Sequence, residues 1–363
     1  MTASMPLLDL DDGEAVTAAD AEGLLRAVAM GGAQIRSTAA AVADGVLGRL
    51  IGFRPRSVIL IAGSGGARHA ARLAIALAGN SIGAPLLVLE HTPSWAGPLD
   101  VVVVAGDDAG DPRLVESVDS AVRRGAEVVV AVPDEGPMRA AAAGRTAVLA
   151  PRLYVPPRHT MTRFLAVFLA VGAVIEDRSP HGRPWEALDR VADAVDAEAV
   201  RSGPGREVFG NPAKSLATRM LGHRVVVCGN GSVATVLSEY ASAALLASGI
   251  SAAAADLSDV IRGARMLYAP RAVGGDSVFH DPFFHDPQLD GALPGESVRA
   301  FVFTTEADQA DTRRRMDALA DADLVVSADD DQSDPGISEM EQVFVLASRV
   351  DMAAAYAQLT GGA

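Results

Sequence analysis

Two short glycine-rich segments stand where a phosphate or another anion could bind. The first is GSGG at residues 63–66 and the second is GNGSVA at residues 229–234. Each follows an apolar run typical of a buried strand and precedes a run of small residues typical of a helix. Such a turn directs several backbone N–H groups, and the positive end of the helix dipole, at one point. Because Ser64 adds a hydroxyl donor, we predict that Ser64, Gly65 and Gly66 bind a phosphate or sugar phosphate. A tight strand–helix turn with no ligand is the alternative.

The second segment also fits the G-x-G-x-x-A pattern of dinucleotide-binding proteins, which is a weak signal by itself. The acidic residue that would bind a ribose is expected about 20 residues later, and Asp256 is close to that place. Gly229 and Gly231 are therefore candidate ligand-binding residues. A nucleotide sugar or a dinucleotide remains an alternative ligand.

Three charged residues lie near the expected ends of other elements. Asp107 and Asp108 follow the apolar run VVVVA. They would repel a phosphate dianion unless a cation bridges them, and two solvated turn aspartates are an equally open interpretation. Arg158 precedes an apolar helix-like run. It could clamp a phosphate through two parallel hydrogen bonds, or it could be an ordinary surface arginine.

Two histidines occur five residues apart in the segment FHDPFFHDP, each followed by an aspartate. Histidine and carboxylate side chains together are able to bind a metal, but no third group of ligands is evident, so we predict no metal site. General acid–base catalysis by His280 or His285 is the chemical alternative. A role in an interface or a lid, without chemistry, is the other.

The order of the apolar runs predicts an α/β protein. Short β-branched runs alternate with helix-like segments, a pattern typical of βαβ units and parallel sheets. The strands expected in the first half are Val58–Ala62, Pro85–Leu89, Val101–Ala105 and Glu127–Val132. Those expected in the second half are Val225–Cys228, Ser251–Ala255, Val298–Thr304 and Leu324–Ser327. We predict N-terminal helices plus a first domain over residues 1–180, a connecting segment over 181–222, and a second domain over 223–363.

Composition excludes several classes of partner. The chain of 363 residues has a formal net charge of −15 and a sequence pI of about 4.9, so nucleic acid and anionic membranes should repel it. A single cysteine, Cys228, rules out an internal disulfide. The acidic N-terminal segment has no basic region followed by a long apolar core, so we expect a cytoplasmic protein.

The chain resembles the sugar-isomerase (SIS) domain proteins, and specifically the bifunctional phosphoglucose/phosphomannose isomerase family. The resemblance rests on the Ser64 loop, the Pro157-Arg158 step, the segment GNGSVATVLSEYASAA, and Asp351 and Tyr356 in the last helix-like run. It implies two tandem SIS-type domains, each a mostly parallel sheet flanked by helices. It also implies a sugar phosphate ligand such as glucose, mannose or fructose 6-phosphate, no cofactor, and a homodimer.

In that family a proton moves between C1 and C2 of a ring-opened aldose phosphate through an enediol. The resemblance places the glutamate base near Ser242, where the nearest carboxylate is Glu239, about one helical turn earlier. It places a histidine near Asp256–Asp259, a stretch without one. We therefore predict a divergent or non-catalytic sugar-phosphate-binding protein. The alternative is an active aldose–ketose isomerase in which Glu239 is the base and a histidine of residues 271–294 opens the ring.

Overall fold

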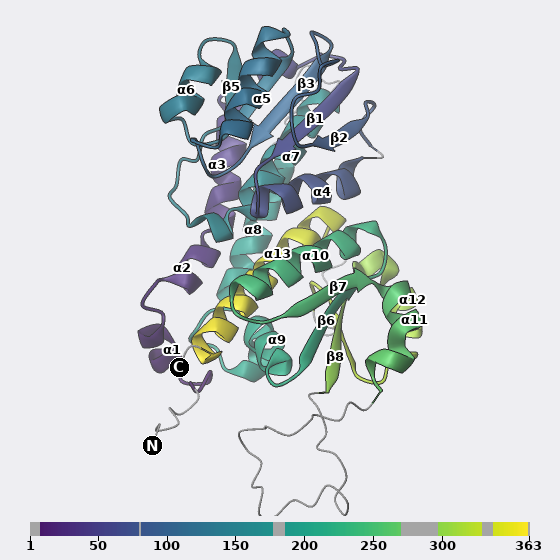
Figure 1. The fold of residues 1–363 in the computed structure, drawn as a ribbon. Helices are drawn as coiled ribbons and strands as arrows, with labels where there is room; N and C mark the ends of the chain where they lie inside the picture. The colour runs from purple at the N-terminus through teal and green to yellow at the C-terminus, as the bar shows by residue number, and fades with distance from the viewer. Residues whose placement is uncertain (1–7, 80, 177–185, 270–296, 329–336, 362–363) are drawn as a thin grey trace, which may run out of the picture.

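The computed structural model describes residues 8–79, 81–176, 186–269, 297–328 and 337–361. Two parallel sheets lie in separate halves of the chain, with helices on both faces of each (Figure 1). The prediction of an α/β protein with two parallel sheets is therefore confirmed. The predicted division into residues 1–180, 181–222 and 223–363 stays a prediction.

The first sheet has five strands in the order β2-β1-β3-β4-β5. Every neighbouring pair is parallel. The sequence analysis foresaw four of the strands and missed the fifth, which has only three residues. The bounds are β1 (Ser57–Ala62), β2 (Leu86–Leu89), β3 (Asp100–Ala105), β4 (Glu127–Ala131) and β5 (Thr146–Val148).

The two faces of this sheet belong to different cores because alternate side chains of a strand point to opposite faces. In β1, Val58 and Leu60 pack with helices α4 (Gly66–Ala78) and α7 (Met161–Glu176). Ile59 and Ile61 lie in a second core with α5 (Pro112–Arg123) and α6 (Gly136–Ala142). Burial on both faces explains why these strands are continuous apolar runs.

The second sheet has four parallel strands in the order β7-β6-β8-β9. The strands are β6 (Arg224–Gly229), β7 (Ala252–Asp256), β8 (Val298–Phe303) and β9 (Ala322–Val325). On one face lie α9 (Pro212–Met220), α10 (Ser232–Ala247) and α13 (Glu339–Gly361). On the other face lie α11 (Leu257–Leu267) and α12 (Gln309–Met316). We did not expect α11, which begins where the Asp256 carboxylate accepts a hydrogen bond from the Ser258 N–H at 2.7 Å.

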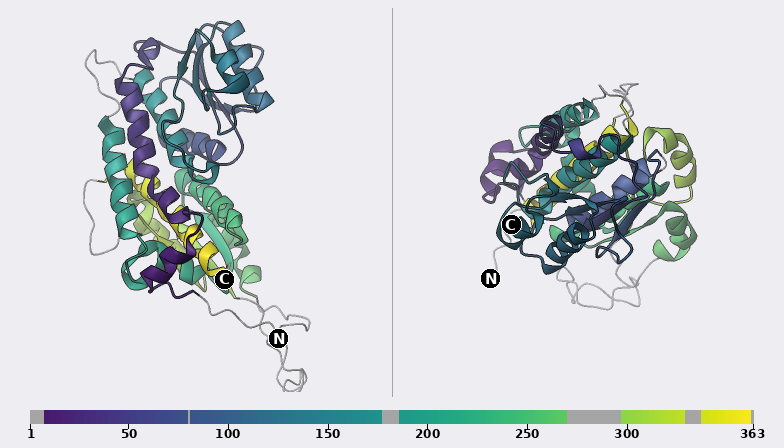
Figure 2. Two further views of the ribbon diagram at one scale, coloured as in Figure 1. Left: turned by 90° about the vertical axis from the view of Figure 1, so that its left-hand side faces the viewer. Right: turned by 90° about the horizontal axis from the view of Figure 1, so that it is seen from above.

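The N-terminal helices and α8 (Glu186–Arg201) form a layer along one side of the molecule. They are α1 (Gly13–Ala19), α2 (Leu24–Ala29) and α3 (Gly31–Ala43). Helices α3 and α8 pack side by side (Figure 2), and α8 also packs on α13. Single 3-10 turns, η1 (Gly48–Leu50), η2 (Pro157–His159), η3 (Val208–Gly210) and η4 (Glu306–Asp308), complete the described elements. None of the described helices has both the length and the hydrophobicity needed to cross a membrane.

Lys214, the single lysine of the chain, is fully buried and fixes the N-terminal segment to this layer. Its Nζ donates to the carbonyl oxygens of Leu10 at 2.5 Å, Pro204 at 2.7 Å and Arg206 at 2.7 Å. Burial lowers the pKa of the Lys214 ammonium, but its three N–H donors all have acceptors, as a buried charge requires. The lysine therefore has a structural role.

A buried ion pair joins α8 to α13. Arg349 donates Nε to Glu198 Oε1 at 2.7 Å and Nη2 to Glu198 Oε2 at 3.0 Å. Glu198 also accepts from Arg201 at 2.8 Å and from the Ser202 hydroxyl at 3.1 Å. Burial alone would raise the pKa of Glu198, but the charges of Arg349 and Arg201 and the hydrogen bonds from Arg349 and Ser202 together outweigh burial and lower that pKa. Removing one partner of a buried ion pair is strongly destabilising.

We expect Glu198→Gln to lower the free energy of unfolding by about 3 kcal/mol, because the substitution keeps the shape of the side chain and removes the buried negative charge that Arg349 faces. Urea unfolding measures this loss. Asp119→Asn is the matched control, since it breaks the exposed pair between Asp119 and Arg123 on α5 and should cost about 0.5 kcal/mol or less. If the two variants lost the same free energy of unfolding, the buried pair would contribute no more to stability than the exposed one.

Candidate functional site

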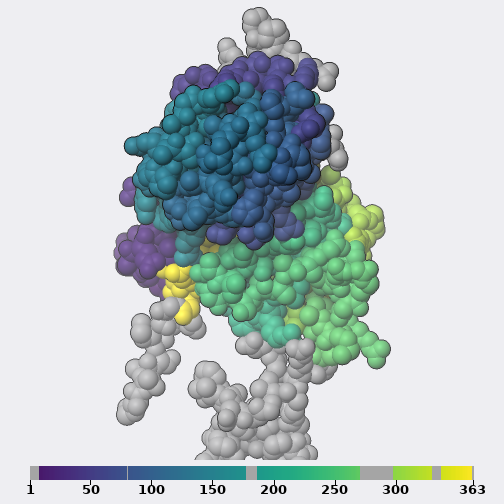
Figure 3. Space-filling view, turned by 45° about the horizontal axis from the view of Figure 1, so that its top comes forward, coloured from purple at the N-terminus to yellow at the C-terminus, as the bar shows by residue number. Residues whose placement is uncertain are grey.

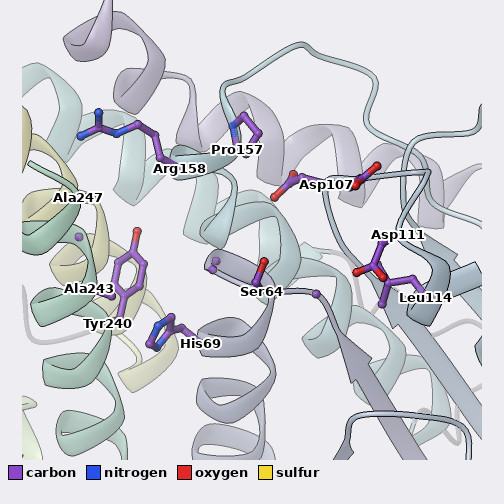
Figure 4. Close-up of a pocket in the computed structure, with 15 residues that line it drawn as sticks. Ser64, His69, Asp107, Asp111, Leu114, Pro157, Arg158, Tyr240, Ala243 and Ala247 are labelled. Carbon is purple, nitrogen blue, oxygen red and sulfur yellow. The ribbon is translucent and has the colours of Figure 1, made fainter.

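A cavity of about 440 Å³ lies between the first sheet and helix α10 of the second half. It opens at the ends of β1 and β3, the edge where ligands bind in parallel α/β folds. Figure 4 shows Ser64, Asp107 and Asp111 on one side and Tyr240, Ala243 and Ala247 on the other. The lining residues are Gly63, Ser64, Gly65, Gly66, His69, Asp107, Asp108, Asp111, Leu114, Pro157, Arg158, Tyr240, Ala243, Ala244 and Ala247.

The predicted loop after β1 forms one wall of this cavity. Gly65 has φ 72°, a conformation that a side chain would oppose. Gly66 begins α4 and packs so closely on α7 that an added Cβ would lie 3.1 Å from the Met161 backbone nitrogen. The loop therefore needs its glycines, and it presents the exposed Ser64 and the first turn of α4 to the cavity.

The loop after β3 brings three carboxylates to the same cavity. Asp107 Oδ2 accepts from the Thr160 hydroxyl at 3.0 Å, and burial raises the pKa of Asp107 despite this hydrogen bond. Asp108 Oδ1 accepts from the Gly110 N–H at 2.7 Å. Asp111 caps α5 by accepting from the Arg113 N–H at 2.9 Å. This part of the cavity wall is therefore acidic.

Helix α10 supplies the opposite wall through Tyr240 and three alanines at helical spacing. The Tyr240 hydroxyl donates to Asp351 Oδ1 of α13 at 2.5 Å. Burial raises the pKa of Asp351 to about 7, although the hydrogen bond from Tyr240 and the charge of Arg158 act against it. Burial raises the pKa of Tyr240 well above its usual range, and the charge of the neighbouring Asp351 raises it further. The buried pair thus fixes the tyrosine ring at the cavity wall.

His69 lies on α4 beside this tyrosine, with ring centroids 5.7 Å apart in an edge-to-face arrangement. Burial lowers the pKa of His69, and the nearby positive charge of Arg72 lowers it further. The imidazole of His69 is therefore harder to protonate than that of an exposed histidine. His69 and Tyr240 were not predicted as site residues. His69 is three residues after Gly66 and Tyr240 directly follows Glu239, but their direction depends on how each helix faces the cavity, which the sequence alone does not give.

Arg158 lines the cavity, but its guanidinium turns toward the second half (Figure 4). Its Nη2 donates to Ser248 Oγ at the end of α10 at 3.0 Å and to Gln358 Oε1 of α13 at 2.9 Å. The arginine therefore holds the edge of the first half against two helices of the second.

Glu239 does not line the cavity. Its carboxylate accepts two hydrogen bonds from Arg72 of α4, one of them at 3.0 Å. Ser242, near which the resemblance places a base, faces its own sheet and donates to the Ala252 carbonyl at 2.6 Å. The structure therefore does not bring Glu239 together with the Ser64 loop.

The second glycine loop is filled by side chains of its own half. Asn230 Nδ2 donates to Thr312 Oγ1 at 2.9 Å, and Asn230 Oδ1 accepts from Arg315. At Gly229 an added Cβ would lie 2.1 Å from the Ala234 backbone, so this glycine serves close strand–helix packing. Gly229 and Gly231 do not line the cavity. His280 and His285 lie outside the described residues.

A scan against protein-family models finds no match, and a search of curated proteins finds no relative. Solved structures do match. The tagatose-6-phosphate ketose/aldose isomerase of Escherichia coli is 14% identical with a TM-score of 0.60, and the match covers 91% of each chain. The C-terminal domain of the glucosamine-fructose-6-phosphate aminotransferase of Francisella tularensis is 10% identical with a TM-score of 0.57, and the match covers 93% of this chain and 96% of that one.

These structures define the class of fold. The chain shares the fold of these structures, with two parallel sheets flanked by helices, along nearly its whole length. At such low identity the likeness establishes the fold alone, and the activity has to be argued from the site.

The buried Asp351 predicts a pH-dependent stability. Its folded pKa is raised to about 7, while an unfolded aspartate titrates near pH 3.9. Its contribution is thus fully present below about pH 4 and is lost as the pH rises through about 7. We compare the free energy of unfolding of the wild type with that of Asp351→Asn. The difference, wild type minus variant, should fall by on the order of a few kcal/mol as the pH rises through this window, and should then level off.

Urea unfolding at pH values from 4.5 to 8 gives this difference directly. Asp259→Asn, at an exposed aspartate of α11, serves as the control and should run parallel to wild type. A constant gap between wild type and Asp351→Asn across the range would show that Asp351 does not titrate in this window.

Proposed function

We propose that this protein binds a sugar phosphate in the cavity between its two halves and does not isomerise it. The observation that carries the proposal is the composition of the cavity wall. The Ser64 loop and the start of α4 offer a hydroxyl and backbone N–H groups to an anion, while the predicted base, Glu239, lies outside the wall and is paired with Arg72. Because the predicted base does not line the cavity, we expect binding without isomerisation by that base.

The phosphate-binding part of the proposal rests on the first turn of α4. This helix has 13 residues, and the first N–H groups of a helix have no partner within it. Those groups and the Ser64 hydroxyl adjoin a cavity whose size is within the usual range for small-molecule sites. A phosphate placed here would accept charge-assisted hydrogen bonds, which are stronger than neutral ones.

The loss of isomerisation follows from what an enediol route requires. A carboxylate has to reach the hydrogen on C1 or C2 within about 3 Å. The Glu239 carboxylate does not line the cavity and is bonded by Arg72 at the partly exposed contact between α4 and α10, so it would have to leave this pair to reach a ligand. The ion pair therefore acts as a structural contact between the halves.

Calorimetric titration with hexose 6-phosphates and a coupled isomerase assay test the two parts. We expect binding, and no interconversion of glucose, mannose and fructose 6-phosphates at high protein concentration. Ser64→Ala should weaken binding about tenfold, because it removes one hydrogen bond to a charged group. Ser120→Ala, on α5 outside the cavity, is the matched control and should bind like wild type.

Two results would overturn the proposal. Turnover that is abolished by Glu239→Gln would establish the aldose–ketose isomerase instead. Absence of binding for the whole hexose 6-phosphate panel, with a folded protein, would remove the sugar phosphate as the ligand class.

A further inference from the structure

We propose that the first half carries, at the end remote from the cavity, a docking surface for an acidic segment of another protein that has apolar side chains among its carboxylates. This arginine surface consists of the four segments that lead into β1, β3, β4 and β5. Its residues are 49–56, 93–99, 123–126 and 143–145.

The arginine surface forms because these strands are parallel neighbours. Their amino ends lie together at one end of the sheet, and the cavity of the proposed function lies beyond the carboxyl ends. Hydrogen bonds join the four segments to one another: the Arg56 N–H to the Leu99 carbonyl at 2.7 Å, Arg124 Nη1 to the Ser94 carbonyl at 2.6 Å, and Arg49 Nη1 to the Arg145 carbonyl at 3.1 Å. The segments therefore make one continuous surface.

This surface is basic within an acidic chain. Its segments contain no aspartate, glutamate or lysine, whereas the whole chain has a formal net charge of −15. The six arginines of the surface are Arg49, Arg54, Arg56, Arg123, Arg124 and Arg145. Carboxylates just outside the segments pair with three of them: Glu127 with Arg49, Asp100 with Arg56, and Asp119 with Arg123.

The other three arginines leave the surface with an unbalanced positive charge. Arg54, Arg124 and Arg145 are exposed, and none of them has a carboxylate partner among the residues that the structure describes. A planar guanidinium matches a carboxylate through two parallel hydrogen bonds. Several carboxylates on one occupant would therefore complement this surface.

Large apolar side chains are exposed on the same surface. The exposed fractions of Ile51, Trp95 and Leu99 are 65%, 48% and 59%. Aromatic residues and arginine are enriched at protein–protein interfaces, and tryptophan and arginine are frequent among the residues that dominate the binding energy. An occupant that covers this surface therefore needs apolar side chains as well as negative charge.

Trp95 is held in place although half of it is open to solvent. Arg56 Nη2 donates to the Trp95 carbonyl at 3.0 Å, and the Arg56 guanidinium lies 5.5 Å from the centroid of the Trp95 ring. Arg124 fixes the preceding residue, Ser94, through its carbonyl oxygen. Docking does not have to order this side chain, which reduces the entropy cost of binding.

The observations favour a protein segment over a nucleic acid as the occupant. Repulsion by the net charge of the chain grows with the charge of the partner, and a nucleic acid carries one negative charge per phosphate. A phosphate backbone also gives Ile51 and Leu99 no apolar group to pack against. A short acidic segment with leucine or phenylalanine supplies both kinds of contact.

Fluorescence anisotropy with three dye-labelled probes tests the proposal. The probes are a peptide in which glutamates flank leucine and phenylalanine, the same peptide with glutamine in place of each glutamate, and an oligothymidylate of equal length. We expect the acidic peptide to bind about tenfold tighter than the glutamine peptide, because its charge complements the surface. Added salt should weaken this binding, since exposed charges are screened.

Variants locate the binding. Arg54→Glu with Arg145→Glu reverses two charges that have no carboxylate partner in the described part of the chain, so the fold should be kept and the acidic peptide should bind about tenfold more weakly. Arg26→Glu with Arg265→Glu is the matched control. It makes the same change of charge at exposed arginines of α2 and α11 and should bind close to wild type. Leu99→Ser should weaken binding several-fold, because it removes an apolar contact. Thermal unfolding establishes that each variant is folded.

Three kinds of result would overturn the proposal. The first is no binding of the acidic peptide, or equal binding by the two charge-reversed proteins. The second is an oligothymidylate that binds tighter than the acidic peptide, which would make nucleic acid the occupant. The third is self-association in sedimentation velocity that is lost in Arg54→Glu with Arg145→Glu, which would make a second copy of this chain the occupant.

Discussion

The packing of α10 against α4 is the contact on which the rest of the molecule depends. These helices follow the first strand of their own sheets, and each covers that sheet with one face and meets the other helix with the opposite face. Val58 and Leu60 of β1 and Val225 and Val227 of β6 consequently belong to one continuous core. The space-filling view shows the two halves in close contact (Figure 3). A shared core of this kind resists hinge motion, so the cavity above it has a fixed shape.

Polar contacts at the same junction determine the direction in which each functional side chain points. Arg72 binds Glu239, and Tyr240 binds the buried Asp351. Arg158 joins the first half to Ser248 and Gln358. Side chains whose types suggest catalysis thus form polar contacts that stabilise the interface between the two halves. The junction provides rigidity where an isomerase would need a free base.

The sequence was sufficient for the scaffold because its signals are local. Apolar runs such as Val101–Ala105, punctuated by glycine, can only be buried parallel strands between helices. It was insufficient for the orientation of side chains on those helices. Glu239 was correctly placed on a helix, but its pairing with Arg72 depends on how two helices distant in the sequence cross. His69 and Tyr240 were missed for the same reason, and β5, with three residues, has too short a pattern to detect.

The two strand–glycine–helix units show that a shared backbone does not preserve a shared site. In the first unit Ser64 stays exposed at the end of its strand, and an open cavity lies in front of it. In the second, Asn230 is bonded to Thr312 and Arg315. The donors that could meet an anion at the second turn therefore already have protein partners. A ligand would have to displace them and break the hydrogen bond from Arg315 to Asn230, a loss that binding would have to offset. Only the first unit combines free donors with space, and its neighbouring loop carries the carboxylates of Asp107 and Asp108.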